Sequence, residues 1–153
     1  MTTLRPMTSE DADETYLAWF RDAEIRRFIA QVPRDLGAAK AYVDSRLNDP
    51  RCRYYAIEAD GRRVGTLKLE RGQVGGVVLG LLIGVAAARG QGIGTTAIDL
   101  GYQEAIHQMQ AVVVTAGIDP DNTPSLHAFR KAKFGLRFYM DHGHARVVAW
   151  RAG

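Results

Sequence analysis

The sequence predicts an α+β protein built around a mixed, mostly antiparallel sheet. Segments with helical spacing of apolar residues fill most of the N-terminal third of the chain. Three strand-like segments then follow one another, joined only by short turns, and helices and strands alternate only after them. A doubly wound parallel sheet would need that alternation along the whole chain, so the order of elements favours the α+β class.

The N-terminal third is expected to hold one short strand and three helices. The first helix starts where Thr8 or Ser9 precedes an acidic turn, and Tyr16, Leu17 and Phe20 continue its apolar face. Prolines following the second and third helices limit how far each can extend. The expected elements are a strand at Thr2–Arg5 and helices near Ser9–Phe20, Ile25–Ile29 and Gly37–Leu47.

Three antiparallel strands are expected next, arranged as a meander. Arg53–Ala59 and Arg62–Glu70 flank Asp60-Gly61, a dipeptide that favours the type I′ turn of a two-residue hairpin. Gly72–Gly76 is a second turn, which leads into the strand Val77–Val85. Gly80 and Gly84 lie inside this third strand and weaken it. Glycine is tolerated there mainly at a bulge, or where another backbone or a ligand comes close.

The remaining chain alternates between helix and strand before a terminal pair of strands. Its turns are marked by Asp119-Pro120-Asp121-Asn122 and Asp141-His142-Gly143-His144. The expected elements are helices at Thr95–Met109 and Thr123–Lys133, and strands at Ala111–Ile118, Leu136–Tyr139 and Arg146–Trp150.

Size and composition describe an ordinary globular protein. At 153 residues with 46% hydrophobic residues, the chain can bury a core, and we expect a single domain over residues 1–153. The net charge of +3 comes from scattered arginines, so no nucleic-acid partner is expected. Cys52 is the only cysteine, and no apolar run has the length of a signal core or a membrane span. We therefore expect a cytoplasmic protein without a membrane partner.

The most informative segment is a glycine loop that follows an apolar strand and begins a helix. Gly90, Gly92 and Gly94 permit backbone angles that are closed to other residues, and they clear side chains away so that successive amides can face one anion. The same amides lie at the positive end of the following helix, which also favours negative charge. This loop predicts a ligand that carries a pyrophosphate.

Two other interpretations of the loop are open. Gly92-Ile93-Gly94-Thr95-Thr96-Ala97 also fits the G-x-G-x-x-A fingerprint of dinucleotide-binding proteins, with Asp119 after the next strand. Three antiparallel strands precede this motif, however, and Asp119 lies further along than a ribose contact needs. Alternatively, the glycines serve only to reverse the chain.

The chain resembles the GNAT superfamily of acetyl-CoA-dependent N-acetyltransferases. Arg89-Gly90-Gln91-Gly92-Ile93-Gly94 is similar to its R/Q-x-x-G-x-G/A motif, and the segment from Asn122 to Phe134 is similar to its N-x-x-[A/S]-x-x-x-[Y/F]-x-K-x-G-F element. The opening Leu4-Arg5-Pro6-Met7-Thr8 resembles the Rim-type ribosomal-protein N-terminal acetyltransferases. The resemblance implies a mixed sheet of about six to seven strands, splayed at strand 4 and flanked by helices.

Two residues depart from the family pattern. Lys133 stands where the family usually has the glycine of its G-F pair, so the turn after that helix is expected to differ. Phe129 stands where many members have a tyrosine that protonates the leaving thiolate, which excludes a tyrosine general acid here.

The resemblance implies a role for each motif residue. The strand end at Gly84 would present backbone groups to the pantetheine arm and an amide to the thioester oxygen, and Arg89 would add charge beside the pyrophosphate. Asn122 would bind the pantetheine arm or cap its helix, and Lys131 would reach a phosphate or lie in solvent. The cofactor-binding residues implied are Ile83, Gly84, Val85, Arg89, Gly90, Gln91, Gly92, Ile93, Gly94, Thr95, Asn122, Phe129 and Lys131.

Proton transfer needs an acid for the thiolate and a base for the amine. Ser125 is the candidate acid, because Rim-type enzymes often have a serine at this place; otherwise it is a first-turn helix residue. Glu70 is the candidate base, since strand alternation puts it on one face with Thr66 and Lys68, although a glutamate there is often only a surface charge. The pair at His142 and His144 lacks further ligands, so no metal is expected.

The resemblance implies direct transfer from acetyl-CoA to a primary amine in a ternary complex. The acceptor would be a protein N-terminus or a small-molecule amine, held between Trp19–Phe28 and the loop Tyr139–His144. Acidic and basic residues both occur in these segments, so their charge does not indicate which amine is the substrate. A non-catalytic acyl-CoA-binding module is the alternative, and exposed strand edges leave room for a homodimer.

Overall fold

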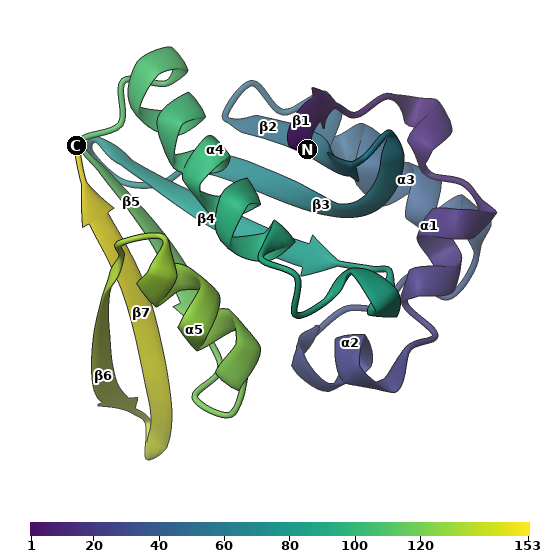
Figure 1. The fold of residues 1–153 in the computed structure, drawn as a ribbon. Helices are drawn as coiled ribbons and strands as arrows, with labels where there is room; N and C mark the ends of the chain where they lie inside the picture. Colours follow the sequence, from purple (N-terminus) through teal and green to yellow (C-terminus); the bar gives the residue numbers. More distant parts are fainter.

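The computed structural model describes residues 1–153. A twisted seven-stranded sheet in the order β1-β2-β3-β4-β5-β7-β6 runs through the molecule (Figure 1). Neighbouring strands are antiparallel except β4 and β5, which are parallel, so the expected mixed sheet is confirmed. The strands are β1 (Thr2–Pro6), β2 (Cys52–Ala59), β3 (Arg62–Arg71), β4 (Gly76–Ile83), β5 (Val113–Ile118), β6 (Gly135–Asp141) and β7 (His144–Ala152).

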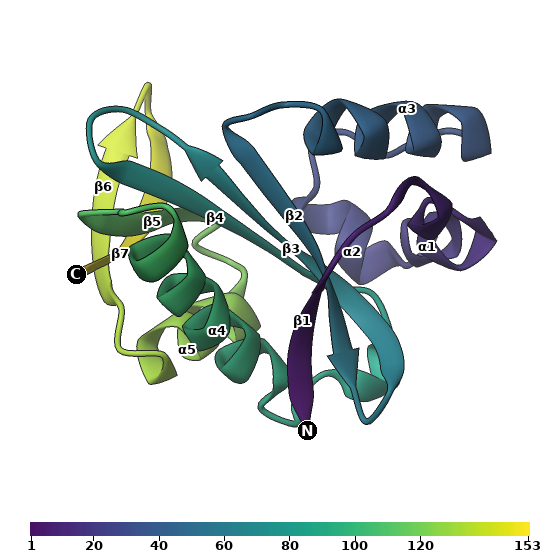
Figure 2. The ribbon, with the colours of Figure 1, turned by 90° about the horizontal axis from the view of Figure 1, so that it is seen from above.

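The helices form a layer on each face of the sheet. Figure 2 shows α1, α2 and α3 on one side and α4 and α5 on the other. None of the helices combines the length and the apolar character needed to cross a bilayer. Their bounds are η1 (Ser9–Asp11), α1 (Glu14–Trp19), α2 (Ala23–Phe28), α3 (Leu36–Leu47), η2 (Ala86–Ala88), α4 (Ile93–Gln108) and α5 (Thr123–Lys131).

Each helical layer buries its own apolar cluster against the sheet. Leu67 and Leu69 of β3 point to the α4 side, where they pack with Ile98 in the larger cluster. Tyr54 of β2 faces the opposite side and packs with Tyr16 in the smaller cluster under α1 and α3. The period-2 alternation of the central strands therefore divides the core into two halves.

The sheet opens between β4 and β5. These strands pair only where Gly76–Val78 lies beside Val113–Thr115, and β4 continues to Ile83 without a neighbour on that side. Figure 1 shows the two strands diverging from their shared start. The splay expected at the fourth strand is therefore present.

The first helix is shorter than the sequence predicted. In place of one helix over Ser9–Phe20, the short turn η1 is followed by a break and then α1. The break occurs because Asp13 caps α1 by accepting from the Tyr16 N–H at 2.9 Å, while Asp11 turns towards the sheet. Both carboxylates also bind Arg63, which lies far away in the sequence.

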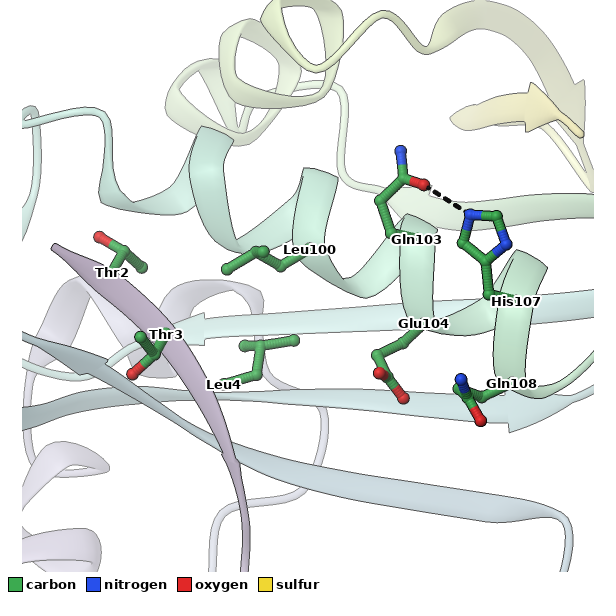
Figure 3. Close-up of a pocket in the computed structure, with 8 residues that line it drawn as sticks. All are labelled: Thr2, Thr3, Leu4, Leu100, Gln103, Glu104, His107 and Gln108. Carbon is green, nitrogen blue, oxygen red and sulfur yellow. Dashed lines mark hydrogen bonds between the residues drawn. The ribbon is translucent and has the colours of Figure 1, made fainter.

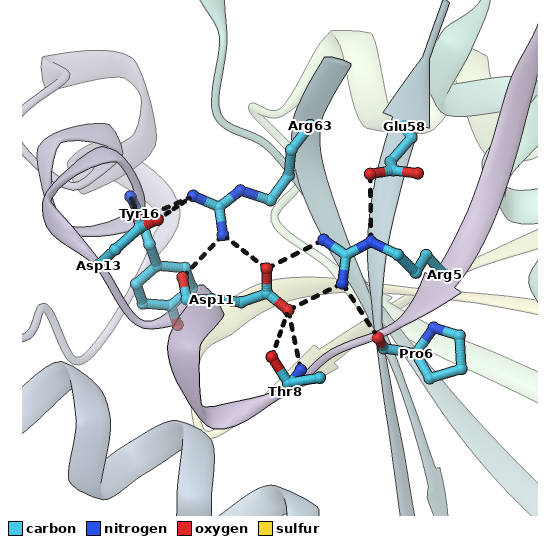
Figure 4. Close-up of polar contacts among 8 residues, drawn as sticks. All are labelled: Arg5, Pro6, Thr8, Asp11, Asp13, Tyr16, Glu58 and Arg63. Atoms are coloured by element: carbon cyan, nitrogen blue, oxygen red, sulfur yellow. Dashed lines mark hydrogen bonds and ion pairs between the residues drawn. The ribbon is translucent and has the colours of Figure 1, made fainter. Parts of the chain in front are cut away.

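An ion-pair network connects η1 and the start of α1 to strands β1 and β3 of the sheet (Figure 4). Arg5 of β1 donates to Asp11 at 2.9 and 3.0 Å, and Arg63 of β3 donates to Asp11 at 3.0 Å and to Asp13 at 2.7 Å. Burial opposes ionisation of Asp11, but the arginines and the Thr8 N–H outweigh it and lower its pKa to about 2. The network thereby holds the start of α1 against the edge of the sheet.

Several element ends also differ from the prediction. The strand expected over Val77–Val85 ends at Ile83, because the N–H groups of Gly84 and Val85 both donate to the Val64 carbonyl and bend the chain away. The helix expected from Thr95 begins at Ile93. The last two strands are longer than expected and meet in a tight turn, with positive φ at His142 and Gly143.

The turn after α5 keeps its usual geometry without glycine. Lys133 adopts φ +69°, and its N–H donates to the Arg130 carbonyl while the Phe134 N–H donates to the Phe129 carbonyl. These two bonds define a Schellman motif, which Phe134 completes by packing against Phe129 at 5.2 Å between ring centroids. The expectation of a different turn at Lys133 was therefore wrong.

Candidate active site

The glycine turn presents a run of free backbone donors. Gly90 and Gly92 adopt left-handed conformations with φ +75° and +78°, and the first helical bond of α4 comes from the Thr96 N–H. No N–H between Gly90 and Thr95 donates to a protein acceptor. A Cβ on Gly90 or Gly92 would meet no atom within 4 Å, so no other part of the protein crowds the turn at these two glycines. Donors arranged in this way at a helix start suit an anion.

The side chain of Arg89 is engaged within the protein. Its guanidinium donates to the Ile83 carbonyl oxygen at 3.1 and 3.2 Å and to the Asp22 carboxylate at 3.0 Å. The pKa of Asp22 lies below its usual value because of the Glu24 N–H and Arg89. The expected role of Arg89 as an additional charge for the pyrophosphate is therefore corrected: it connects the end of β4 to the start of α2.

The far end of β4 lines the opening of the sheet. Since the Gly84 N–H donates to Val64 of β3, alternation along the strand turns the polar groups of Leu81 and Ile83 to the open side. The amides of Gly84 and Val85 are occupied by Val64, so neither is free for the thioester oxygen as expected. The Ile83 N–H is the backbone donor nearest to this point on the open side.

Gly84 is required by an aromatic neighbour. A Cβ built on Gly84 would lie 2.1 Å from Cδ2 of Trp19, whose indole is buried against the strand end. Arg63, a member of the ion-pair network, lies over the same ring at 5.4 Å. The sequence marks Gly84 as an otherwise unfavourable glycine inside a strand, but it does not indicate that Trp19 is the neighbour that requires it.

The residues expected on α5 fall into different environments. Asn122 caps the helix by accepting from the Ser125 N–H at 3.4 Å, while the Ser125 hydroxyl is half-buried and makes no hydrogen bond within the protein. Lys131 is exposed and unpaired. Phe129, expected to contact the cofactor, is only 3% exposed and packs in the core, so this expectation is corrected.

The structure does not bring Glu70 to the open end of β4. Glu70 lies opposite Val78, at the closed end where β4 still pairs with β5, whereas Ile83 lies opposite Gly65. Its carboxylate binds Arg46 of α3 at 2.9 Å. Glu70 is therefore an ion-paired residue away from the glycine turn.

The two segments expected to hold the acceptor also lie apart. Trp19–Phe28 spans the last residue of α1 and all of α2, and it is close to the end of β4 through Trp19 and Asp22. The loop Tyr139–His144 is the tip of the β6–β7 hairpin, which stands well away from α2 in both ribbon views (Figures 1 and 2). Since Ile118 at the end of β5 pairs with Val147, this hairpin lies on the β5 side of the opening, whereas the first segment lies on the β4 side.

A hollow of about 510 Å³ lies elsewhere, between β1 and the C-terminal half of α4 (Figure 3). Its polar side chains are paired locally: His107 contacts Gln103 at 3.1 Å, and Glu104 accepts from the Tyr55 hydroxyl at 2.9 Å. It is far along α4 from the glycine turn, so it is not part of this site. No group of three or more His, Cys, Asp or Glu side chains is arranged to hold a metal ion.

A sheet that opens between β4 and β5, beside a glycine turn that starts a helix, defines the acyltransferase class that the motif Arg89–Gly94 also indicates. The chain belongs to the acetyltransferase (GNAT) domain family, whose model matches residues 2–135. The resemblance drawn from the sequence is therefore confirmed. A search of curated proteins gave no match.

Solved structures with the same fold include an aminoglycoside acetyltransferase and two Rim-type enzymes. Aminoglycoside acetyltransferase AAC(6')-Ib in complex with coenzyme A and kanamycin matches with a TM-score of 0.85 and 18% identity, over 99% of this chain and 95% of that chain. RimJ of Mycobacterium smegmatis matches with a TM-score of 0.79 and 19% identity, over 99% and 81%. RimL in complex with coenzyme A matches with a TM-score of 0.84 and 14% identity, over 99% and 93%.

Proposed function

We propose that this protein transfers an acetyl group from acetyl-CoA to a primary amine by direct attack in a ternary complex. The observation that carries the proposal is the unbroken run of free N–H groups from Gly90 to Thr95 at the start of α4. These donors fit the pyrophosphate of acetyl-CoA, and the open side of β4 fits its extended arm. The proteins of the same fold that were solved with coenzyme A support this choice of ligand.

The residues around the opening supply binding and orientation. Acetyl-CoA brings a thioester, whose carbonyl carbon the neutral amine attacks while the carbon–sulfur bond breaks and the thiolate leaves. We assign the Ile83 N–H, on the open side of β4, as the donor to the thioester oxygen. The free hydroxyl of Ser125 is the group we assign to protonate the thiolate.

The base that deprotonates the amine is not assigned to a side chain. Glu70 is bound by Arg46, and Asp22 is bound by Arg89, so neither carboxylate is free beside the opening. A water chain leading to solvent is sufficient for this step, because the amine needs only to lose its proton before attack.

A non-catalytic module that binds acyl-CoA is the second candidate. It is favoured by the absence of a tyrosine at Phe129, whose side chain is in the core. The two candidates share the cofactor site and differ only in turnover, so release of the CoA thiol in the presence of amines separates them.

Titration calorimetry with acetyl-CoA, with NADH in parallel, tests the cofactor. We expect micromolar binding of acetyl-CoA and no heat from NADH. Gly92→Asp should abolish binding, because its carboxylate faces the pyrophosphate, whereas Gly92→Asn should retain part of it. Asp and Asn tolerate the left-handed backbone of this position similarly, so the pair isolates the charge. Equal affinity in both variants, or binding of NADH instead, would refute the proposed cofactor.

A further inference from the structure

A small hollow of about 200 Å³ opens between α1, α2 and the segment that joins α2 to α3. Its floor is apolar, and its charged lining residues are all arginines. The lining residues are Leu17, Phe20, Val32 and Pro33 on the apolar side, and Arg21, Arg26 and Arg34 on the charged side. The hollow therefore joins an apolar surface to positive charge without any carboxylate.

The guanidinium groups of the hollow are available to a ligand. Arg21 and Arg26 are exposed and have no ion-pair partner in the protein. Arg34 has only Asp35, at 3.9 Å, and its side chain is 90% exposed. Asp22 binds Arg89, and Asp35 accepts from the Ala38 N–H at 2.8 Å. Glu24, the remaining acidic residue of this segment, does not line the hollow.

The hollow adjoins the place where the transfer would occur. Trp19 lies against Gly84 at the end of β4, and Asp22 binds Arg89 in front of the glycine turn. Arg21 lies between these two contacts in the sequence. Arg21 is adjacent in the chain to Asp22, and the contacts of Asp22 with Arg89 and of Arg89 with the Ile83 carbonyl oxygen connect this part of the hollow to the end of β4.

We propose that the acceptor is a small amine that carries a carboxylate and an apolar body, with the carboxylate bound by Arg21 and Arg26. This inference rests on the proposed transferase function and names its acceptor class. Guanidinium groups bind carboxylates through charge-assisted hydrogen bonds. The volume is below the range of about 300–1,000 Å³ typical of pockets for drug-sized ligands, so an amino-acid-sized molecule fits. A polycation such as kanamycin is disfavoured by the arginines.

Acetylation of matched acceptors tests the acceptor class. With acetyl-CoA saturating, the rate of CoA thiol release is measured for leucine, for leucinamide, which lacks the carboxylate, and for kanamycin. We expect kcat/KM, expressed per concentration of neutral amine because only that form attacks, to be about tenfold or more higher for leucine than for leucinamide, as one charge-assisted hydrogen bond supplies. Kanamycin should be the poorest acceptor.

Variants of α2 test whether the carboxylate of the acceptor binds at Arg26. Arg26→Gln should lower kcat/KM for leucine about tenfold, mainly by raising KM, and leave leucinamide unchanged. Arg27→Gln is the matched control, because Arg27 is the next residue of the same helix, lies over the Phe28 ring at 4.9 Å and does not line the hollow. It should change neither acceptor.

Calorimetry with acetyl-CoA on the same preparations separates the two proposals. If the protein binds acetyl-CoA but prefers leucinamide or kanamycin, the carboxylate inference is refuted and the transferase function stands. An equal loss for leucine and leucinamide in Arg26→Gln would likewise refute it. Failure to bind acetyl-CoA would overturn both.

Discussion

The guanidinium of Arg89 binds the Ile83 carbonyl oxygen and the Asp22 carboxylate, so its charge is largely neutralised inside the protein. Affinity for a pyrophosphate then depends on the backbone amides of the glycine turn and on the N-terminus of α4. The same contacts join the loop that would hold the cofactor to the helix that borders the acceptor hollow. A single side chain thus connects the two halves of the proposed site.

Lys133 offers a direct test at this scale. Its left-handed backbone is unfavourable for a residue with a Cβ, so Lys133→Gly should raise the free energy of unfolding by about 1 kcal/mol. Urea denaturation measures the change. Lys133→Ala removes the same charge but keeps the Cβ, and it should give no gain; an equal gain in both variants would attribute the effect to charge.

Gly84→Ala should destabilise the protein by about 2 kcal/mol, because its Cβ would overlap the Trp19 indole. Gly80→Ala is the control on the same strand, since the nearest atom to its Cβ is 3.9 Å away, and it should be nearly neutral. In a Trp19→Leu background the cost of Gly84→Ala should fall markedly. An unchanged cost, measured by thermal or urea unfolding, would show that Trp19 is not the cause.

At the scale of elements, η1 and α1 are held against the sheet by ion pairs. The buried carboxylate of Asp11 receives hydrogen bonds from two strands at once, through Arg5 of β1 and Arg63 of β3. Arg63 also lies over Trp19, so the network positions the aromatic ring that covers the end of β4. Loss of these ion pairs would therefore also change the position of Trp19 beside the end of β4 in the proposed site.

The pKa of Asp11 determines how the contribution of these ion pairs to the free energy of unfolding depends on pH. Because its folded pKa of about 2 lies below the ordinary value, its contribution is complete above about pH 5 and is lost as the pH falls towards 2. The loss should be about 2 kcal/mol greater in wild type than in Asp11→Asn, where the other carboxylates with a lowered pKa, such as Asp22, still contribute. Unfolding free energies measured by urea at a series of pH values would show this difference. Glu10→Gln, which changes an exposed neighbour, should follow wild type.

Elements set by local chemistry were predictable from the sequence, and those set by distant partners were not. Asp60-Gly61 forms the expected turn, with φ +52° and +79°, because its own residues determine it. The break before α1 depends on Arg63, which lies some fifty positions away in the chain. The role expected for Glu70 failed for the same reason, since periodicity places it on the correct face but cannot show that Arg46 binds it.

At the scale of the whole molecule, the sheet has one edge that is poorly covered. β6 is its last strand, and Phe138, Tyr139 and Met140 in succession are 61%, 43% and 68% exposed. Trp150 of the neighbouring β7 is 48% exposed. Apolar side chains beside unpaired strand donors favour pairing with another chain.

We therefore expect two copies to associate through β6. Sedimentation at increasing concentration should show a dimer, and Met140→Lys should shift the equilibrium to the monomer. Val74→Lys changes an exposed apolar residue in the turn before β4, away from β6, and should leave the dimer intact. A wild-type protein that stays monomeric at the highest concentration would contradict this prediction.

The short pairing of Gly76–Val78 with Val113–Thr115 also determines which parts of the protein unfold together in local unfolding. Strands β1–β4 and β5–β7 are otherwise joined mainly through α4, which packs in the cluster shared by both. Native-state hydrogen exchange should therefore resolve two cooperative units, one for each part of the sheet, whose separation follows the release of α4. A ligand that spans the opening would merge these units into one and slow exchange in both.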